Sequence, residues 1–195
     1  FSSIEMLVSL YDTVLNPDKD TFILSKGHSC FPLYVLLREK GYNPKIMGHP
    51  EIEPQEGIYA TTGSLGHGLP IGVGRAFARK LQKREGKVYV MLGDGECQEG
   101  TTWESSLFAV QHRLDNLVAI VDYNKIQGSA EVNSVLPLGD LRTKFEALGW
   151  YATEIDGHNF PQIIKELNET KEQKPKMIVA HTIKGKGVSF MENTP

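Results

Sequence analysis

The sequence contains very little cysteine, which argues against several classes of small protein. Only Cys30 and Cys97 occur among its 195 residues, they lie far apart, and neither has a second cysteine at C-x-x-C spacing. A disulfide framework or a zinc ribbon is therefore not expected. A chain of this length buries roughly 70% of its unfolded surface on folding, so it needs neither of them for stability. We expect both thiols to be packing residues in a reducing, cytoplasmic environment.

The sequence also lacks an excess of one charge and any long hydrophobic run. It has 21 basic and 24 acidic residues and a pI of about 6.1, so its overall charge does not favour nucleic acid or an anionic membrane. Its longest apolar runs, residues 117–121 and 177–180, are far shorter than the roughly 20 residues that cross a bilayer. The first residues have no basic or apolar region of the kind found in signal peptides. We expect a soluble protein with no nucleic-acid or membrane partner.

What the sequence does contain is a regular alternation of short apolar runs and amphipathic segments. Strands are predicted over residues 88–92, 117–122, 151–155 and 177–181, and a short strand or loop over 21–25. Helices are predicted over 4–15, 66–84, 101–112, 138–148 and 161–170, with a further helix that ends at Gly41. This alternation predicts parallel β–α–β units, and hence an α/β fold with three αβα layers and a mainly parallel sheet. No repeat, linker or low-complexity segment divides the chain, so residues 1–195 are predicted to form a single domain.

Several local signals refine this prediction. Capping boxes are expected where Ser2 precedes Glu5 and where Thr101 precedes Glu104, because these pairs have the S/T-x-x-E spacing. Residues 42–65 have no period, and so long an irregular loop in a compact domain is expected to be functional. The helix over 66–84 carries small residues that are predicted to let other backbone approach one of its faces, namely Gly68, Gly72, Gly74, Ala76 and Ala78.

Polar residues follow two of the predicted strands directly. Gly93-Asp94-Gly95 comes after the strand over 88–92, and Asn124 lies just after the strand over 117–122. The spacing between Asp94 and Asn124 fits one complete helix-and-strand crossover. If the two strands are neighbours, the carboxylate and the amide oxygen meet at the carboxyl edge of the sheet, where open parallel sheets bind ligands.

The chemistry of these residues points to magnesium and a diphosphate. The Asp94 carboxylate, the Asn124 side-chain carbonyl and the main-chain carbonyl of Ile126 are hard oxygen donors, too few for Ca²⁺ but suited to Mg²⁺ that also binds phosphate oxygens. Gly93 and Gly95 would let a diphosphate approach main-chain N–H groups, and the following helix adds its positive end. A Gly-Asp-Gly run alone occurs in many turns, but its position after a strand and the matching Asn124 favour a site.

Longer motifs now add a specific resemblance. They are Leu24-Ser25-Lys26-Gly27-His28, Gly48-His49-Pro50-Glu51, Thr61-Thr62-Gly63-Ser64-Leu65-Gly66, and Gly93-Asp94-Gly95-Glu96-Cys97-Gln98-Glu99-Gly100 with Trp103-Glu104. The run from Gly93 to Asn124 resembles the thiamine diphosphate motif, and the other motifs resemble the transketolase family. They extend from about residue 24 to 187 in the order found in that family, which makes the resemblance specific and nearly as long as the chain.

The resemblance implies a diphosphate-binding domain and assigns roles to particular residues. Asp94, Asn124 and the Ile126 carbonyl would hold Mg²⁺ on thiamine diphosphate. His28 and His49 would face the reacting carbons, and histidine is suited to moving hydroxyl protons near neutral pH. The residues that would contact the cofactor are Leu65, Gly66, His67, Gly93, Asp94, Gly95, Glu96, Asn124, Ile126 and Lys184.

Three of the residues in these motifs keep an alternative interpretation. His67 stands where transketolases often have Gln, and it either contacts the cofactor diphosphate or bonds to loop main chain. Lys184, in the run Lys184-Gly185-Lys186-Gly187, could close over a diphosphate, although a solvated turn explains the run nearly as well. Glu99 resembles an acid near the family's subunit interface, and it could equally favour the positive end of a helix.

The resemblance also implies that part of the enzyme lies elsewhere. In the transketolase family, the glutamate that activates the cofactor belongs to a pyrimidine-binding domain, for which 195 residues leave no room, and further family segments are expected beyond both ends. We therefore expect the partner to be a C-terminal transketolase subunit, in an α2β2 heterotetramer that transfers a two-carbon ketol unit between sugar or sugar phosphate substrates. The alternatives are a subunit of a decarboxylating relative, such as a deoxyxylulose-phosphate synthase or a 2-oxoacid dehydrogenase, and a diphosphate-binding partner without catalysis.

Overall fold

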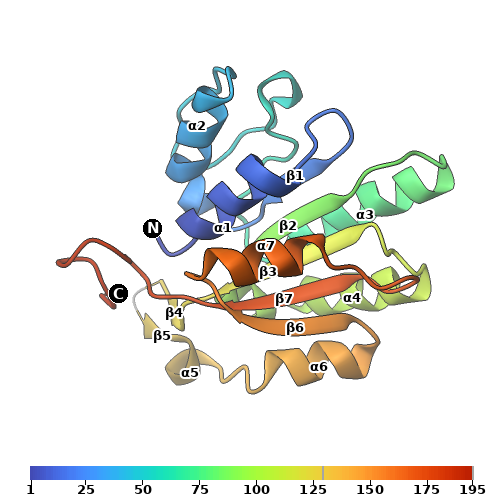
Figure 1. Ribbon diagram of the computed structural model, residues 1–195. Helices are drawn as coiled ribbons and strands as arrows, with labels where there is room; N and C mark the ends of the chain where they lie inside the picture. Colours follow the sequence, from blue (N-terminus) through green and yellow to red (C-terminus); the bar gives the residue numbers. More distant parts are fainter. Residues whose placement is uncertain (129, 195) are drawn as a thin grey trace.

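The computed structural model describes residues 1–128 and 130–194 and has one five-stranded sheet at its centre (Figure 1). The strands are β1 (Thr21–Leu24), β2 (Val88–Gly93), β3 (Leu117–Tyr123), β6 (Tyr151–Asp156) and β7 (Lys176–His181). Their order across the sheet is β1-β2-β3-β7-β6, and every neighbouring pair is parallel. The predicted strands are therefore all present, with small shifts at their ends.

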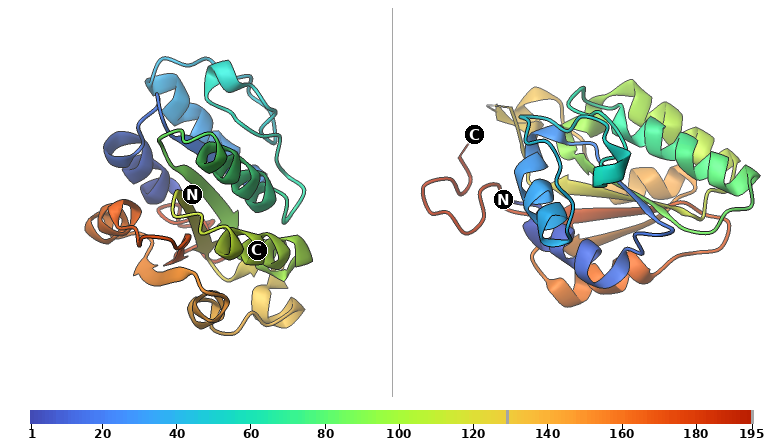
Figure 2. Two further views of the ribbon diagram at one scale, coloured as in Figure 1. Left: turned by 90° about the vertical axis from the view of Figure 1, so that its right-hand side faces the viewer. Right: turned by 90° about the horizontal axis from the view of Figure 1, so that it is seen from above.

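Helices cover both faces of this sheet, as the two rotated views show (Figure 2). On one face lie α1 (Ile4–Ser9), α2 (Cys30–Glu39) and α7 (Phe160–Asn168), and on the other α3 (Gly68–Leu81), α4 (Gly100–Gln111) and α6 (Leu141–Leu148). Alternate strand residues point to the two layers: Tyr89 and Met91 pack with the first set of helices, and Val88 and Val90 with the second. The predicted three-layer αβα fold is confirmed.

Short elements surround the carboxyl edge of the sheet. Two 3₁₀ turns follow β1 and β2, at Gly27–Ser29 and Asp94–Gln98, and a third, Pro54–Glu56, lies in the long loop between α2 and α3. After β3 come the small antiparallel pair β4 (Ile126–Gln127) and β5 (Ala130–Glu131), and then α5 (Val132–Val135). Gly93 pairs with Asp122 and Tyr123 with His181, so the ends of β2, β3 and β7 lie level and their loops emerge side by side.

Both predicted capping boxes are wrong, because tertiary partners take the hydroxyl groups. Ser3 precedes α1 without a side-chain cap, and the Ser2 Oγ donates to Asp122 instead. The helix α4 begins at Gly100, while the Thr101 Oγ1 donates to the carbonyl of Gly66 at 2.8 Å. Long-range acceptors thus outcompete the local cap at both sites.

Three predicted helices also have different bounds. The first leaves α-helical geometry at Leu10 and continues as a π-helix over Leu10–Val14, and the Gly-rich helix occupies only Gly68–Leu81. The helix predicted from residue 138 begins at Leu141, because the Asp140 side chain caps it by accepting from the Thr143 amide at 2.9 Å. The sequence left Asn159 and Phe160 as candidates for the cap of α7, and the structure shows Asn159 in that role, accepting from the Gln162 amide.

The small residues of α3 do not share one face, which corrects the sequence-based expectation. Gly68, Gly72 and Ala76 are buried, whereas Gly74 and Ala78 are exposed. A Cβ added to Gly72 would lie 2.3 Å from Cγ2 of Val90, while nothing lies within 4 Å of one added to Gly74. The close approach of α3 to the sheet therefore requires small residues only at Gly68, Gly72 and Ala76, which are four residues apart and so share one face of the helix.

No helix within residues 1–128 and 130–194 combines the length and hydrophobicity that a bilayer span requires.

Candidate functional site

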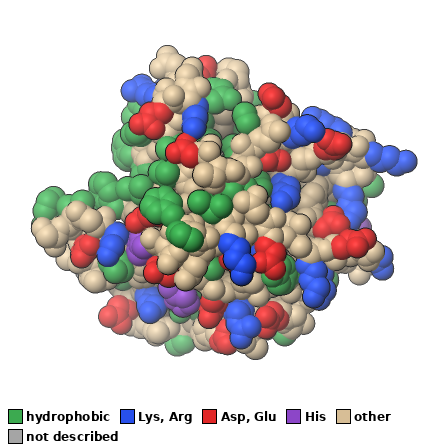
Figure 3. Space-filling view, viewed as in Figure 1, with side chains coloured by type: hydrophobic (Ala, Val, Ile, Leu, Met, Phe, Trp, Pro, Cys, Tyr) green, Lys and Arg blue, Asp and Glu red, His purple; other side chains and the backbone are tan. Residues whose placement is uncertain are grey.

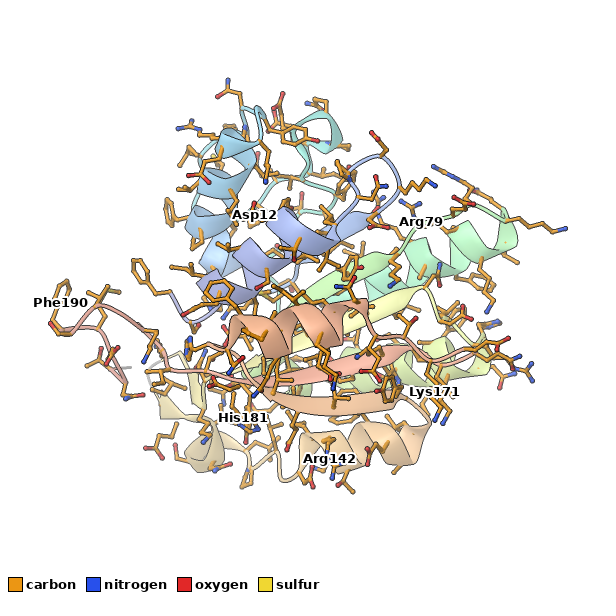
Figure 4. The ribbon with its side chains drawn as sticks, viewed as in Figure 1. Asp12, Arg79, Arg142, Lys171, His181 and Phe190 are labelled. Carbon is orange, nitrogen blue, oxygen red and sulfur yellow. The ribbon has the colours of Figure 1, made fainter. Side chains whose placement is uncertain are left out.

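A large cavity opens at the carboxyl edge of the sheet, with a volume of about 1150 Å³. The turns after β1, β2 and β3 form one part of its lining, here called the floor, and α1, α2 and the segment after β7 form the rest. Figure 4 shows the side chains at this edge, with His181 near the end of β7 and Phe190 on the segment that projects beyond it. The cavity is thus where the sequence predicted a ligand site.

Asp94 and the turn containing Asn124 meet on this floor. Asp94 is 2% exposed, and its Oδ2 accepts a hydrogen bond of 2.6 Å from the main-chain amide of Lys125. Its Oδ1 accepts from the Gly95 amide at 2.8 Å. The Asn124 Oδ1 accepts from the Ile126 amide at 3.0 Å, and Lys125 adopts a positive φ of 68°. The two loops therefore form one continuous surface in the cavity.

The charge state of Asp94 suits a cation ligand. Burial raises the pKa of its carboxyl to about 6, and the amides of Lys125 and Gly95 oppose this only in part. A carboxylate that has lost so much hydration gains strongly when a cation comes into contact with it.

The oxygen donors on this floor fit Mg²⁺ better than a metal that needs a protein cage. Among the residues that the structure describes, no group of three or more His, Cys, Asp or Glu side chains could hold a metal. Asp94, Asn124 and Ile126 line the cavity together, so a cation here would use a carboxylate, an amide oxygen, a main-chain carbonyl and oxygens of its own ligand. That donor set is typical of Mg²⁺ bound with phosphate groups.

Gly95 is required by the close approach of the two loops. A Cβ at this position would lie 2.5 Å from Oε1 of Gln127 and 3.3 Å from its Cβ. Gly93, Gly95 and Gln127 all line the cavity, so the absence of a side chain at Gly95 keeps the second loop against the first and leaves main chain facing the cavity.

Glu96 holds the loops around the cavity together. Its side chain is fully buried, and its carboxylate accepts from the Ser25 hydroxyl, from the Gly93 amide at 2.8 Å and from the Gly66 amide at 3.1 Å. Burial raises its pKa despite these bonds. Glu96 thus links the ends of β1 and β2 to the turn before α3.

The structure also reveals a buried ion pair that the sequence reasoning missed. Lys26, which lines the cavity and is 2% exposed, pairs with Asp122, which is fully buried. Asp122 also accepts from the Ser2 hydroxyl at 2.6 Å and from the Thr182 hydroxyl. Burial alone would raise the pKa of Asp122, but the Lys26 ammonium and the hydroxyl groups of Ser2 and Thr182 together outweigh burial and lower that pKa.

A signal for this pair was present in the sequence. Lys26 lies within the Leu24-Ser25-Lys26-Gly27-His28 run, and Asp122 ends a buried strand in the way that Asp94 follows one. Only the tertiary structure, in which β1 lies two strands from β3 in the same sheet, shows that these charges meet.

The three histidines predicted to lie at the site, His28, His49 and His67, differ in their position relative to the cavity. His28 lines the cavity and is exposed at its surface, and the loss of part of its hydration, together with Lys26, lowers its pKa to about 4, so its ring is neutral at pH 7. Neither His49 nor His67 is among the described residues that line the cavity. Like His28, both are exposed, and the His49 ring lies against Gly63, where an added Cβ would be 2.7 Å from its Cδ2.

The other predicted contacts divide in the same way. Leu65 and Lys184 line the cavity, with the Lys184 Nζ 3.4 Å from the Gly128 carbonyl. The main-chain amide of Gly66 donates a hydrogen bond to the Glu96 carboxylate. The Nδ1 of His67 lies 2.9 Å from the Leu65 carbonyl, which matches the interpretation that His67 bonds to loop main chain.

Two residues near the site have packing roles. Cys30 and Cys97 are free and buried, as predicted, and the Cys30 Sγ donates to the carbonyls of Met47 and Gly48. Glu99 lies at the start of α4, against the backbone of Gly66.

Comparison with known proteins agrees with this geometry. Residues 10–195 match the family model described as transketolase, thiamine diphosphate binding domain. The chain is 39% identical to an apulose-4-phosphate transketolase subunit of Phocaeicola vulgatus, covering 98% of this chain and 75% of that protein. It is 38% identical to the 6-deoxy-6-sulfo-D-fructose transketolase subunit of a Clostridium species, covering 96% of this chain and 76% of that protein.

Solved structures give the same result at the level of the fold. Transketolase from Leishmania mexicana superposes with a TM-score of 0.85 at 29% identity over 93% of this chain. Transketolase from Campylobacter jejuni does so with a TM-score of 0.84 at 30% identity over 98%. The matched part is 32% and 34% of those chains, so this chain spans about a third of them. On the fold, the cavity and these matches, the chain belongs to the transketolase family, as its thiamine diphosphate binding domain.

Proposed function

We propose that this chain is the N-terminal, diphosphate-binding subunit of a two-chain transketolase that transfers a two-carbon ketol unit between sugar or sugar phosphate substrates. The observation that carries the proposal is the meeting of the buried Asp94 carboxylate with the Asn124 turn in the cavity. A nearly uncharged cavity floor would offer nothing to a magnesium diphosphate, whereas this one offers hard oxygen donors and glycine main chain.

We assign the cofactor contacts from this floor. Asp94, Asn124 and the carbonyl of Ile126 would hold Mg²⁺, and the residues that would contact thiamine diphosphate are Leu65, Gly66, His67, Gly93, Gly95, Glu96 and Lys184. Support is strongest for those that line the cavity and weakest for Gly66 and His67, which bond to protein groups. Thiamine diphosphate, when bound, supplies the carbanion chemistry of ketol transfer.

The protein's own residues would then hold charge and protons in place. The Lys184 ammonium would face the diphosphate, and Lys26, whose charge is balanced by Asp122, lines the same cavity. His28 has a neutral ring, so it can accept the proton of a substrate hydroxyl. His49 is assigned to the substrate side of the entrance, outside the cavity itself.

A partner chain is part of the proposal. Three relatives, from Phocaeicola, Actinobacillus and Clostridium, carry names that describe one subunit of a transketolase. These names support a second subunit that carries the pyrimidine-binding domain and the activating glutamate. We propose an α2β2 heterotetramer in the cytoplasm, with the cofactor between the two kinds of chain.

Two other functions remain as alternatives that the same experiment separates. A decarboxylating enzyme of the deoxyxylulose-phosphate synthase or 2-oxoacid dehydrogenase type would use pyruvate or another 2-oxoacid. A diphosphate-binding partner without catalysis would bind cofactor and turn over neither kind of substrate. The transketolase names of the relatives favour the first proposal.

The experiment mixes this chain with its partner subunit, thiamine diphosphate and Mg²⁺, and offers ketose donors or pyruvate. The donors follow the substrates in the names and titles of the relatives: apulose 4-phosphate, 6-deoxy-6-sulfo-D-fructose and xylulose 5-phosphate. Ketol transfer to an aldose acceptor, without release of CO₂, is expected. CO₂ release from pyruvate would instead assign the decarboxylating function, and cofactor binding without any turnover would assign the non-catalytic one.

A further inference from the structure

His158 links three parts of the molecule close to the cavity. It lies between β6 and α7, and its side chain is 14% exposed. Its Nδ1 lies 3.0 Å from Oε1 of Glu5 in α1, and its Nε2 accepts a hydrogen bond of 2.9 Å from the main-chain amide of Ile183. Ile183 comes directly before Lys184, so the ring contacts the segment that supplies a cation to the cavity.

The hydrogen-bond pattern defines the state of this ring. A main-chain N–H can only donate, so the Nε2 of His158 carries the lone pair and its Nδ1 carries the hydrogen. The Nδ1–H then donates to the Glu5 carboxylate. Both ring nitrogens are therefore used, and the ring orientation is fixed from α1 on one side and from residue 183 on the other.

Successive anchors hold the chain as it leaves β7. The amide of Gly157 donates to the carbonyl of His181 at 2.8 Å, the Thr182 hydroxyl donates to Asp122, and the amide of Ile183 donates to His158. A Cβ on Gly157 would lie 2.4 Å from Cγ2 of Thr182, which shows how closely the two loops pack.

The bond to His158 is the last of these bonds that ties the chain to a neighbouring loop before the cavity, and beyond it the carbonyl of Lys184 accepts a hydrogen bond of 2.9 Å from the amide of Asn193 in the same C-terminal segment. Lys184 and Gly185 both line it, and the chain turns there, since Gly185 has a φ of 73°. The lysine side chain has several rotatable bonds, so the position of its ammonium depends on where the main chain at residue 184 is held.

We propose that His158 is a positioning residue for diphosphate binding. By accepting the Ile183 amide, it fixes the course of the chain into Lys184 and so keeps the Lys184 ammonium facing a diphosphate in the cavity. This inference rests on the proposed function, because it takes Lys184 to be a diphosphate contact. Loss of the bond should weaken diphosphate affinity by up to about tenfold, the usual worth of one hydrogen bond.

Three variants separate the two bonds of the ring. Glutamine at this position places an oxygen acceptor near the site of Nε2, whereas asparagine reaches only the site of Nδ1, and alanine reaches neither. His158→Gln should therefore keep the affinity for thiamine diphosphate close to that of wild type, and His158→Asn and His158→Ala should lose it. The affinity is measured by calorimetry in the assembled enzyme at saturating Mg²⁺, with inorganic diphosphate as a second probe.

Hydrogen exchange supplies a readout that does not depend on the cofactor. In enzyme without cofactor, the Ile183 amide should exchange faster in His158→Asn and His158→Ala than in wild type, and His158→Gln should restore its protection. Circular dichroism and thermal unfolding identify any variant that fails to fold. If the alanine variant does not fold, the comparison of glutamine with asparagine decides the question.

Lys184→Ala and the double variant His158→Ala/Lys184→Ala distinguish the inference from the proposed function. If His158 acts through Lys184, the double variant should bind diphosphate no more weakly than Lys184→Ala alone. Additive losses would overturn the inference, as would unchanged affinity in His158→Asn. Unchanged affinity in Lys184→Ala would instead remove Lys184 from the proposed cofactor site.

Discussion

At the scale of single residues, Asp94 is the most direct test of the metal assignment. Asp94→Ala removes the only carboxylate assigned to Mg²⁺, and it also leaves the Lys125 and Gly95 amides without their acceptor. We expect affinity for thiamine diphosphate with Mg²⁺ to fall by about a hundredfold or more in the assembled enzyme, with native circular dichroism. Calorimetric titration measures it, and wild-type affinity in this variant would show that the metal assignment is wrong.

His28 and His49 test the substrate side of the same cavity. His28→Ala should lower turnover or raise the ketose KM while sparing cofactor affinity more than Asp94→Ala does, because His28 lines the cavity without being assigned to the metal. The same is predicted for His49→Ala. Since the pKa of His28 is lowered to about 4, on the order of 95% or more of the His28 rings are neutral from pH 5.5 upward. The loss of activity in His28→Ala should therefore be equal at pH 6 and pH 8. Steady-state kinetics that match wild type in both variants would contradict these roles.

At the scale of elements, the packing of α3 on the sheet depends on the absence of a side chain at Gly68 and Gly72. A Cβ on Gly68 would lie 2.2 Å from Oγ and 2.7 Å from Cα of Ser25, whose hydroxyl binds Glu96. Gly68→Ala should therefore lower the free energy of unfolding by about 2 kcal/mol. In the matched control Gly74→Ala the added Cβ meets nothing, and stability should rise by about 0.5 to 1 kcal/mol. Urea unfolding compares the two, and equal effects would refute this packing argument.

The junction of α7 with β7 depends on a second buried ion pair. Lys176 is fully buried and Glu166 is 8% exposed, with 2.8 Å between Nζ and Oε2. Glu166→Ala leaves the ammonium with the Glu169 carbonyl, and should lower the free energy of unfolding by about 3 kcal/mol at pH 7. Lys165→Ala is the control, because Lys165 is exposed and lies 3.8 Å from the same carboxylate, and it should change stability by less than about 1 kcal/mol.

The same pair predicts a pH dependence. Burial opposes the ionised form of Glu166, but the favourable interactions of its carboxylate, those with Lys176 foremost, together outweigh burial and lower the pKa below the usual 4.5. A carboxyl with a lower pKa in the folded state stabilises the protein above its unfolded pKa and loses that contribution as the pH falls through the folded value. The stability difference between wild type and Glu166→Ala should therefore be constant above the usual value and shrink below it. A difference that grew in acid would contradict the assignment.

At the scale of the whole molecule, exposed hydrophobic side chains predict a partner. They gather around α1 and α2 and on the C-terminal segment in the view of Figure 3, and Leu107 and Phe108 of α4 are 55% and 41% exposed. We expect this chain alone to be inactive with thiamine diphosphate and ketose, and to gain activity when the partner subunit is added. Ketol transfer by the purified chain alone would contradict the two-chain proposal.

The surface of α4 gives this prediction a structural test. Leu107→Glu should weaken association with the partner, as measured by light scattering. It should not lower thermal stability, because Leu107 is largely exposed in the chain alone. Leu81→Glu, at the far end of α3 and 67% exposed, is the control and should leave association unchanged. Normal assembly of the Leu107 variant would show that the partner binds elsewhere.

How much of the molecule follows from the sequence depends on the range of the interaction. Strand and helix periods are local, so the α/β class and the five strands could be predicted. The meeting of Asp94 with the Asn124 turn could be predicted too, because two neighbouring parallel strands bring their carboxyl ends to one edge. Side-chain caps failed where a distant acceptor competed, as it did for Ser2, whose partner Asp122 is 120 residues away.

The sequence by itself thus determined the layers of the fold and the edge of the sheet at which Asp94 and the Asn124 turn meet. The tertiary structure decided which distant side chains reach the cavity. Because β7 lies beside β3, Thr182 contacts Asp122 and Lys184 lines the cavity. The tertiary structure also placed His28 in the cavity and His49 and His67 outside it, although all three lie in similar polar loops. The physical reason is that a local pattern encodes period and burial, whereas the partner of a buried charge depends on strand order and on which distant donor fits best.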